Sequence, residues 1–277
     1  MLHLGQFNDL KLLRFTTVGA YLGDEDDNDV LLPNRYLEPS FEVGQELRVF
    51  LYLDHDERIV ATTEIPKIEL HTFEYLKAVE TTHIGAFLDW GLMKHLFCPF
   101  KEQAVKMEEG KYYLVYLYID NATQRLVASA KVKKYLEKEH IVVSEGQEVD
   151  LLICDKTDLG QNVIVNDTYA GLIFNNHISR VLNRGQHTKG YILKVREDGK
   201  LDISLDKPGY QKIEPASEVL LQFIQENNGK LFLTDKSDPD EIREIVGMSK
   251  KTFKQAVGNL YKQKYIIINE DSIEMIV

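Results

Sequence analysis

The chain has 277 residues, which is too long for one small barrel and suits two to four domains. Its net charge of −11 argues against tight, non-specific binding to a polyanion, and no apolar run is long enough to span a membrane. The two cysteines form no disulfide framework, and the first residues lack the features of a signal peptide. We therefore expect a cytoplasmic protein that does not associate with membranes.

The acidic residues are concentrated at the start of the chain. Residues 1–67 carry 13 Asp and Glu against 6 Lys and Arg, whereas Thr168–Arg196 and Ile245–Asn269 contain basic residues and no acid. Since phosphates are repelled by carboxylates, a polyanionic partner should meet the second half of the protein.

The main organising feature is a unit that occurs three times. Each copy begins with a glycine-led stretch, continues with an apolar cluster and a break, and reaches a second glycine 25 residues after the first. The glycine pairs are Gly19 and Gly44, Gly85 and Gly110, and Gly160 and Gly185. Strand-like runs follow every second glycine, so the chain contains an internal repeat.

Each unit reads as five short strands separated by turns, which predicts a small closed barrel. The strands expected in the first unit are 6–18, 19–22, 30–32, 47–53 and 59–63. Those of the second unit are 70–84, 85–89, 94–97, 112–118 and 125–130. A charged segment, 131–139, is expected to form a short linker helix before the third unit, which runs from 148 to 205.

The periodicity changes after Pro215. Helical spacing of apolar residues predicts helices over 216–228, 237–246 and 250–262, and a hairpin follows at 265–268 and 273–276. The short turn Gly247-Met248-Ser249 separates the last two helices, as in a winged helix-turn-helix.

We therefore predict a mostly β, multidomain protein. Three tandem five-stranded OB-fold barrels occupy 1–65, 66–139 and 140–212, and an α+β winged helix-turn-helix domain occupies 213–277. The first barrel is acidic, and its loop 24–29 would repel phosphate, so we expect it to serve for protein contact or spacing.

The motif Gly85-Ala86-Phe87-Leu88-Asp89, with the strands that follow it, resembles the S1 RNA-binding domain, an OB-fold barrel. Three such units before a winged helix resemble the conserved virulence factor B family of bacterial RNA-binding proteins. The patterns at Asp235–Ile242 and Met248–Lys254 add to the resemblance. It implies regulation of gene expression through RNA contact, without enzymatic activity or a cofactor.

OB-fold barrels bind single strands by stacking bases on aromatic side chains and by placing cations along the phosphates. In the third unit Val163 replaces the first aromatic residue, so neighbouring residues are expected to take over. The predicted RNA contacts are Phe87, Trp90, Lys94 and Phe97 in the second barrel, Tyr169, Phe174, His177, Arg180, Arg184, Lys189 and Lys194 in the third, and Lys250, Lys251 and Lys254 in the winged helix.

Structural alternatives stay open for several of these residues. Phe87 and Phe97 could belong to the barrel core, Trp90 could lie exposed or at a domain interface, and the lysines after Ser249 could form a solvated helix face. The pair His95 and Cys98 has metal-ligand spacing, but no second pair accompanies it, so we interpret it as structural.

Three functions remain in competition. The first is an RNA-binding regulator that uses the third barrel and the winged helix as one basic face for single-stranded RNA. The second is a transcription factor that binds duplex DNA through the winged helix. The third is a scaffold whose barrels bind proteins, for example on the ribosome.

The first hypothesis makes a direct prediction. Reversing the charge of the basic residues within 180–194 and 250–254 should weaken RNA binding and flatten its dependence on salt, because fewer counterions are released. Affinity measured at two salt concentrations checks this, and an unchanged affinity would contradict the hypothesis.

Overall fold

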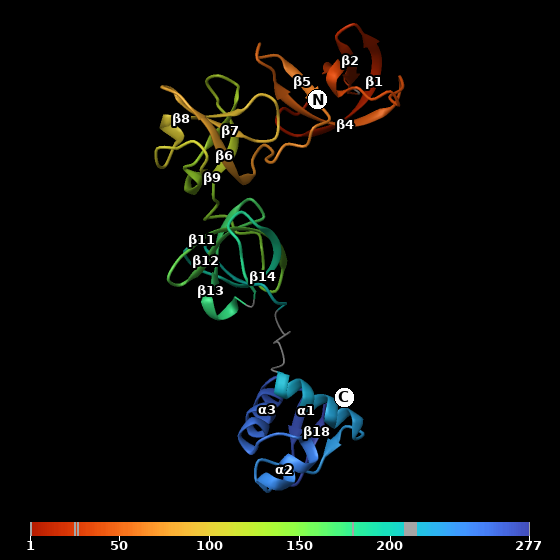
Figure 1. The fold of residues 1–277 in the computed structure, drawn as a ribbon, viewed down its shortest axis with the longest axis vertical. Helices are drawn as coiled ribbons and strands as arrows, with labels where there is room; N and C mark the ends of the chain where they lie inside the picture. Colours follow the sequence, from red (N-terminus) through yellow and green to blue (C-terminus); the bar gives the residue numbers. More distant parts are fainter. Residues whose placement is uncertain (1, 25, 27, 179, 208–214, 277) are drawn as a thin grey trace. The chain divides into compact units, whose positions relative to one another are not determined.

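The structure is a computed structural model that describes residues 2–24, 26, 28–178, 180–207 and 215–276. The chain forms two compact units, Met1–Leu205 and Asp206–Val277 (Figure 1). The first unit contains three successive β-structures of five strands each, and the second is the helical domain. The predicted fold class is confirmed.

The strands of the three barrels follow the same order along the chain. The first barrel contains β1 (Phe7–Thr16), β2 (Gly19–Gly23), β3 (Asp29–Pro33), β4 (Glu46–Leu53) and β5 (Ile59–Thr62). The second contains β6 (Phe73–Thr81), β7 (Gly85–Asp89), β8 (Leu96–Pro99), β9 (Tyr112–Ile119) and β10 (Leu126–Ser129). The third contains β11 (Glu148–Lys156), β12 (Gly160–Val165), β13 (Tyr169–Phe174), β14 (His187–Val195) and β15 (Leu201–Ser204).

Closure differs slightly among the barrels. The first and third close through a parallel pairing of the third strand with the fifth, β3 with β5 and β13 with β15. In the second, β8 and β10 lie beside each other at the two edges of the sheet, so this barrel is nearly closed.

A bulge in the first strand of every barrel is held by the second glycine of the repeat. The amide of Gly110 donates to the carbonyl of Ala78 at 2.8 Å, and the amide of Ala78 donates to the carbonyl of Lys111 at 2.9 Å. The strand register shifts directly after Ala78. Gly110 has a φ of 83°, a left-handed conformation that glycine adopts without a steric cost. The same bonds join Gly44 to Leu12 and Gly185 to Ile153.

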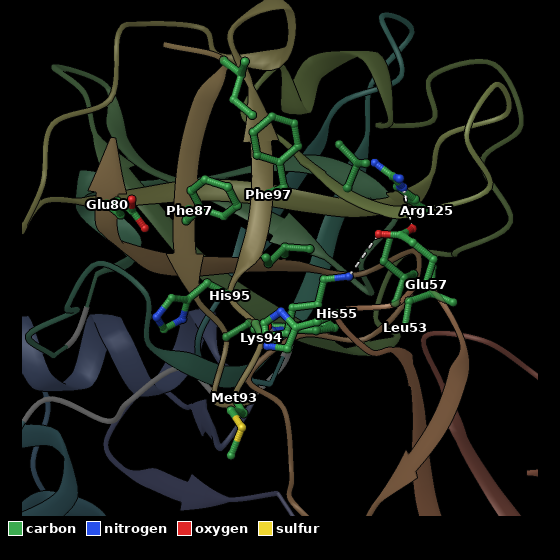
Figure 2. A pocket seen from close by; sticks show the side chains of 15 residues that line it. Leu53, His55, Glu57, Glu80, Phe87, Met93, Lys94, His95, Phe97 and Arg125 are labelled. Atoms are coloured by element: carbon green, nitrogen blue, oxygen red, sulfur yellow. Dashed lines mark hydrogen bonds and ion pairs between the residues drawn. The ribbon is translucent and has the colours of Figure 1, made fainter. Parts of the chain in front are cut away.

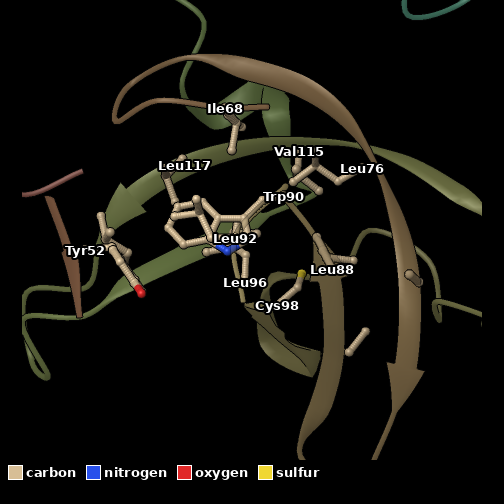
Figure 3. Close-up of a cluster of buried hydrophobic side chains, with 14 of the residues drawn as sticks. Tyr52, Ile68, Leu76, Leu88, Trp90, Leu92, Leu96, Cys98, Val115 and Leu117 are labelled. Carbon is tan, nitrogen blue, oxygen red and sulfur yellow. The ribbon is translucent and has the colours of Figure 1, made fainter. Parts of the chain in front are cut away.

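The barrels of the first unit share apolar contacts. The core of the second barrel, which includes Leu88, Trp90 and Leu117, is continuous with Phe50 and Tyr52 from the first barrel (Figure 3). A smaller cluster joins residues of β6 to Leu152, Cys154 and Ile164 of the third barrel. The barrels therefore pack on one another within this unit.

The helix predicted over 131–139 is wrong in extent. Only the 3₁₀ turn η3 (Val132–Lys134) forms, and Glu137 makes a bridge to Tyr169 of β13. The amide of Glu137 donates to the carbonyl of Thr168 at 2.9 Å. Pairing with the third barrel therefore overrides the local helical propensity of this segment.

The helical domain contains α1 (Pro215–Glu226), α2 (Pro239–Val246) and α3 (Lys250–Lys262), with β16 (Lys230–Leu231), β17 (Ile266–Ile268) and β18 (Ile273–Met275). Asp238 and Ser249 cap α2 and α3, and Gly247 ends α2 with a φ of 68°. The sheet order is β16-β18-β17, so the hairpin gains a third strand that the sequence pattern did not predict.

The contribution of individual glycines to stability can be tested by substitution. Gly110→Ala should destabilise the first unit by about 1–2 kcal/mol, because alanine resists a left-handed φ. Gly85→Ala should cost more, because its Cβ would collide with the carbonyl oxygen of Cys98. In contrast, Gly258→Ala in α3 meets no atom within 4 Å and should stabilise the helical domain by about 0.5–1 kcal/mol. Thermal unfolding by circular dichroism measures all three, and the opposite order would contradict this account.

Candidate nucleic-acid interface

Two phenylalanines form an aromatic platform on the second barrel. Phe87 of β7 and Phe97 of β8 are paired across the strands, with ring centroids 5.2 Å apart and planes 40° from parallel. Their neighbours Leu88 and Cys98 point into the core and are 0 % exposed, whereas both phenylalanines are half-buried. Strand alternation therefore places the pair on the outer side of the barrel, not in its core.

A cavity of about 390 Å³ adjoins this platform (Figure 2). Phe87, Phe97 and Ile84 line it from the second barrel, and Leu53 and His55 line it from the first. A volume of this size is in the range of small-ligand sites. The aromatic pair and the cavity thus form one concave surface that two barrels build.

The cations beside the platform are already paired. The Glu57 carboxylate of the first barrel forms ion pairs with Arg125, at 2.5 Å from its Nε, and with Lys94, at 3.4 Å from its Nζ (Figure 2). Lys94 also donates to the carbonyl of Asp54 at 2.7 Å. The predicted contact Lys94 therefore fastens the first barrel to the second, and much of its charge is used there.

Trp90 lies at the domain interface, one of the two places that the sequence leaves open. Its side chain is 3 % exposed, and Nε1 donates to the carbonyl of Lys94 at 2.6 Å. The ring packs edge-on against Phe50 at 5.9 Å and Tyr52 at 6.5 Å (Figure 3). A ring held in this way has no face available for a base, so Trp90 positions the surface.

The third barrel lacks the aromatic platform, and the alignment of this unit from its sequence is wrong by one residue. Gly160 pairs with Phe174 as Gly85 pairs with Pro99, so the place of Phe87 belongs to Asn162 and not to Val163. Asn162 pairs with Leu172, while Val163 is 2 % exposed and lies in the core.

The other predicted aromatic contacts of the third barrel are dispersed. Tyr169 is buried, and its hydroxyl donates to the carbonyl of His140 at 3.4 Å. Phe174 is half-buried, with the guanidinium of Arg196 at 5.3 Å from its ring centre. His177 lies half-buried in the turn η4 (Asn175–His177).

The basic residues of the third barrel differ in how much of their charge is used. Arg184 stacks on Tyr75 of the second barrel at 4.5 Å and pairs with Asp155 at 3.2 Å. Lys189 pairs with Asp150 at 2.6 Å, and Arg180 donates to the Thr188 hydroxyl at 2.9 Å. Lys194 is exposed and makes no ion pair within the described part of the chain.

The three predicted lysines of the helical domain also differ in burial and in their ion pairs. Lys250 is half-buried, and its ammonium donates to the carbonyl of Ser237 at 2.8 Å. Lys254 pairs with Asp235 at 3.5 Å. Lys251 is exposed on α3, and no ion pair joins it to another described residue.

The first barrel places Tyr21 where the second has Phe87. The Arg14 guanidinium lies 4.2 Å from its ring centre and pairs with Asp29 at 2.7 Å. Arg14 thus covers one face of Tyr21, and its own charge is paired with Asp29.

His95 and Cys98, whose spacing we interpret as structural, lie in different surroundings. Burial raises the pKa of the Cys98 thiol to about 12, and His95 lies on the outer surface. In the described ranges no group of three His, Cys, Asp or Glu side chains could hold a metal ion. The nearby Asp89 carboxylate accepts a hydrogen bond from Lys67, which lowers its pKa. No described helix is long and apolar enough to cross a membrane.

Comparisons with known proteins agree with this architecture. Residues 4–64 match a family model described as an S1 domain, and residues 218–275 match one described as a CvfB-like winged helix domain. The chain therefore combines an S1 domain in its first barrel with a winged helix, and both are domain types of nucleic-acid-binding proteins.

Relatives extend the match over most of the chain. Conserved virulence factor B of Staphylococcus epidermidis is 27% identical over 246 residues, covering 86% of this chain and 82% of that protein. The uncharacterized protein YitL of Bacillus subtilis is 29% identical over 269 residues, covering 93% and 89%. These matches confirm the resemblance inferred from the sequence: the chain is similar to conserved virulence factor B over most of its length.

A solved structure also aligns along the chain. It is described as a multidomain protein with nucleic acid binding domains from Streptococcus pneumoniae, and the alignment covers 99% of this chain and 98% of that one. The sequence identity is 21% and the TM-score is 0.40.

The positioning role of Trp90 has a testable consequence. Trp90→Phe keeps an aromatic ring but loses the hydrogen bond to Lys94, so it should lower stability by about 0.5–1.5 kcal/mol. Its affinity for single-stranded RNA, measured by titration at a temperature where it is folded, should change less than about twofold. A loss of about fivefold or more, as expected for a base-stacking residue, would make Trp90 a contact.

Proposed function

We propose that this protein binds single-stranded RNA without catalysing a reaction, and that the second barrel supplies the stacking surface. The observation that carries the proposal is the outward-facing pair Phe87 and Phe97, on the two strands that form the binding face of OB-fold barrels. Each base has two π faces, so adjacent rings at this spacing suit successive bases of one strand.

Single-stranded RNA fits this surface better than duplex. Stacking on Phe87 and Phe97 requires bases that are splayed out, and paired bases present their edges instead. The ion pairs of Lys94 and Arg125 with Glu57 leave little free positive charge beside the rings. Base stacking, rather than phosphate attraction, therefore dominates at the platform.

Phosphate contacts come from other residues in this proposal. Arg180 and Lys194 of the third barrel, and Lys251 of the helical domain, are exposed and make no ion pair with another described residue. Surface pairs such as Lys189 with Asp150 and Lys254 with Asp235 are weak and could exchange for phosphate at little cost. This assigns the basic second half of the chain a supporting role.

We further propose that the protein regulates gene expression after transcription, in the bacterial cytoplasm. The S1 domain supports the contact with RNA on which this role depends. The ribosome and other proteins remain partners in this proposal, through surfaces of the first barrel that face away from the platform.

The test is a fluorescence titration with a labelled single-stranded RNA, the same sequence as single-stranded DNA, and a DNA duplex, each at two salt concentrations. RNA should bind most tightly. Phe87→Ala and Phe97→Ala should each weaken RNA binding about 5- to 150-fold, since base stacking contributes about 1–3 kcal/mol.

Tyr112→Ala is the matched control, because Tyr112 is 58 % exposed on β9 and does not line the cavity. It should leave affinity unchanged. Equal loss in Tyr112→Ala and Phe97→Ala would refute the platform. A preference for duplex DNA would assign the function to α3 of the winged helix, and no binding to any probe would favour a protein-binding scaffold.

A further inference from the structure

We propose that the cavity between the first two barrels receives one unstacked base of the bound single strand, so that the acidic first barrel is part of the RNA site. The inference rests on the proposed function and extends it, because it adds a pocket to the open aromatic platform. The pocket would hold the nucleotide next to those stacked on Phe87 and Phe97.

The chemistry of the cavity wall suits a planar ring with polar edges. Ile84, Met93 and Phe97 from the second barrel and Leu53 from the first provide apolar surface. Six polar side chains stand among them: Glu57 with its ion-pair partners Lys94 and Arg125, and His55, His95 and Glu80 (Figure 2). A mostly apolar wall with some polar groups is the usual composition of a site that fixes the orientation of an organic ring.

The polar side chains outside these ion pairs are available for a ligand. The side chains of His55, His95 and Glu80 make no hydrogen bond to another described residue. A histidine ring can donate or accept, depending on its tautomer, and a carboxylate accepts. Together they can match the donors and acceptors on the edge of a base, which a purely apolar cavity could not do.

Charge explains why a base and not a phosphate would enter. Glu57 and Glu80 bring carboxylates to the cavity, while Lys94 and Arg125 are held by Glu57. A phosphate would meet these two carboxylates, and the two cations of the lining, Lys94 and Arg125, share the single carboxylate Glu57. This balance of charge favours an uncharged base inside the cavity, with the backbone of the strand outside.

The wall from the first barrel is held in place before any ligand arrives. Lys94 donates to the carbonyl of Asp54, Arg125 pairs with Glu57, and Trp90 packs against Phe50. These contacts surround the turn that carries His55, so binding a base requires no closure of one barrel on the other. A preorganised wall reduces the entropy lost on binding.

The experiment combines changes in the RNA and in the protein. A labelled single-stranded oligoribonucleotide of about 12 nucleotides, within the length that an OB-fold covers, is bound to the full chain with an abasic site at each position in turn. One position outside the stacked pair should lose about fivefold or more in affinity. His55→Ala should weaken binding of the intact RNA. In this variant, the abasic site at that one position should cause little further loss of affinity, while the effects at the other positions stay as in the wild type.

His83→Ala provides the control, because His83 is exposed on the second barrel and does not line the cavity. It should leave the abasic profile of the wild type unchanged. A wild-type profile that persists in His55→Ala would overturn the base pocket while the platform stands. If Phe97→Ala loses RNA binding but no abasic position in the RNA depends on His55, the pocket is wrong and the platform stands. If the wild type binds no RNA, both proposals are wrong.

Discussion

All three barrels depend on the hydrogen bonds between a left-handed glycine and the bulge of the first strand. Gly44, Gly110 and Gly185 each donate to the carbonyl of the residue at which the register shifts. The bulge bends the strand so that it can pair with the second strand on one side and the fourth on the other. Barrel closure, and with it the outward direction of each side chain, follows from this repeated contact.

The same scaffold presents different chemistry in each copy. At one equivalent place the three barrels carry Tyr21, Phe87 and Asn162, and only Phe87 faces a second aromatic ring across the sheet. Arg14 covers Tyr21, and the residue opposite Asn162 is an aliphatic leucine. The repeat therefore preserves the backbone, while a pair of aromatic rings at this place is found in the second barrel alone of the three.

Local signals are enough to predict the fold, but not the surroundings of the site. The glycine spacing and the caps at Asp238 and Ser249 act within a few residues, so the barrels and the winged helix can be predicted correctly. Trp90 is buried by Phe50 and Tyr52, and Lys94 is paired with Glu57, all from a different barrel. Contacts between residues so far apart in the chain produce no local pattern in the sequence. The residue equivalent to Phe87 is easily taken to be Val163 and not Asn162, because a shift of one residue along a strand moves a side chain from the outer face to the core face.

The continuous core of the first two barrels has a consequence for how the chain can be divided. Phe50 and Tyr52 fill a gap around Trp90 that the second barrel leaves open on its own. A fragment beginning after the first barrel would expose this apolar surface to water, and apolar patches of that kind promote aggregation. The acidic barrel thus completes the interior of its neighbour, and a second barrel without it would need polar residues in place of the apolar ones around Trp90.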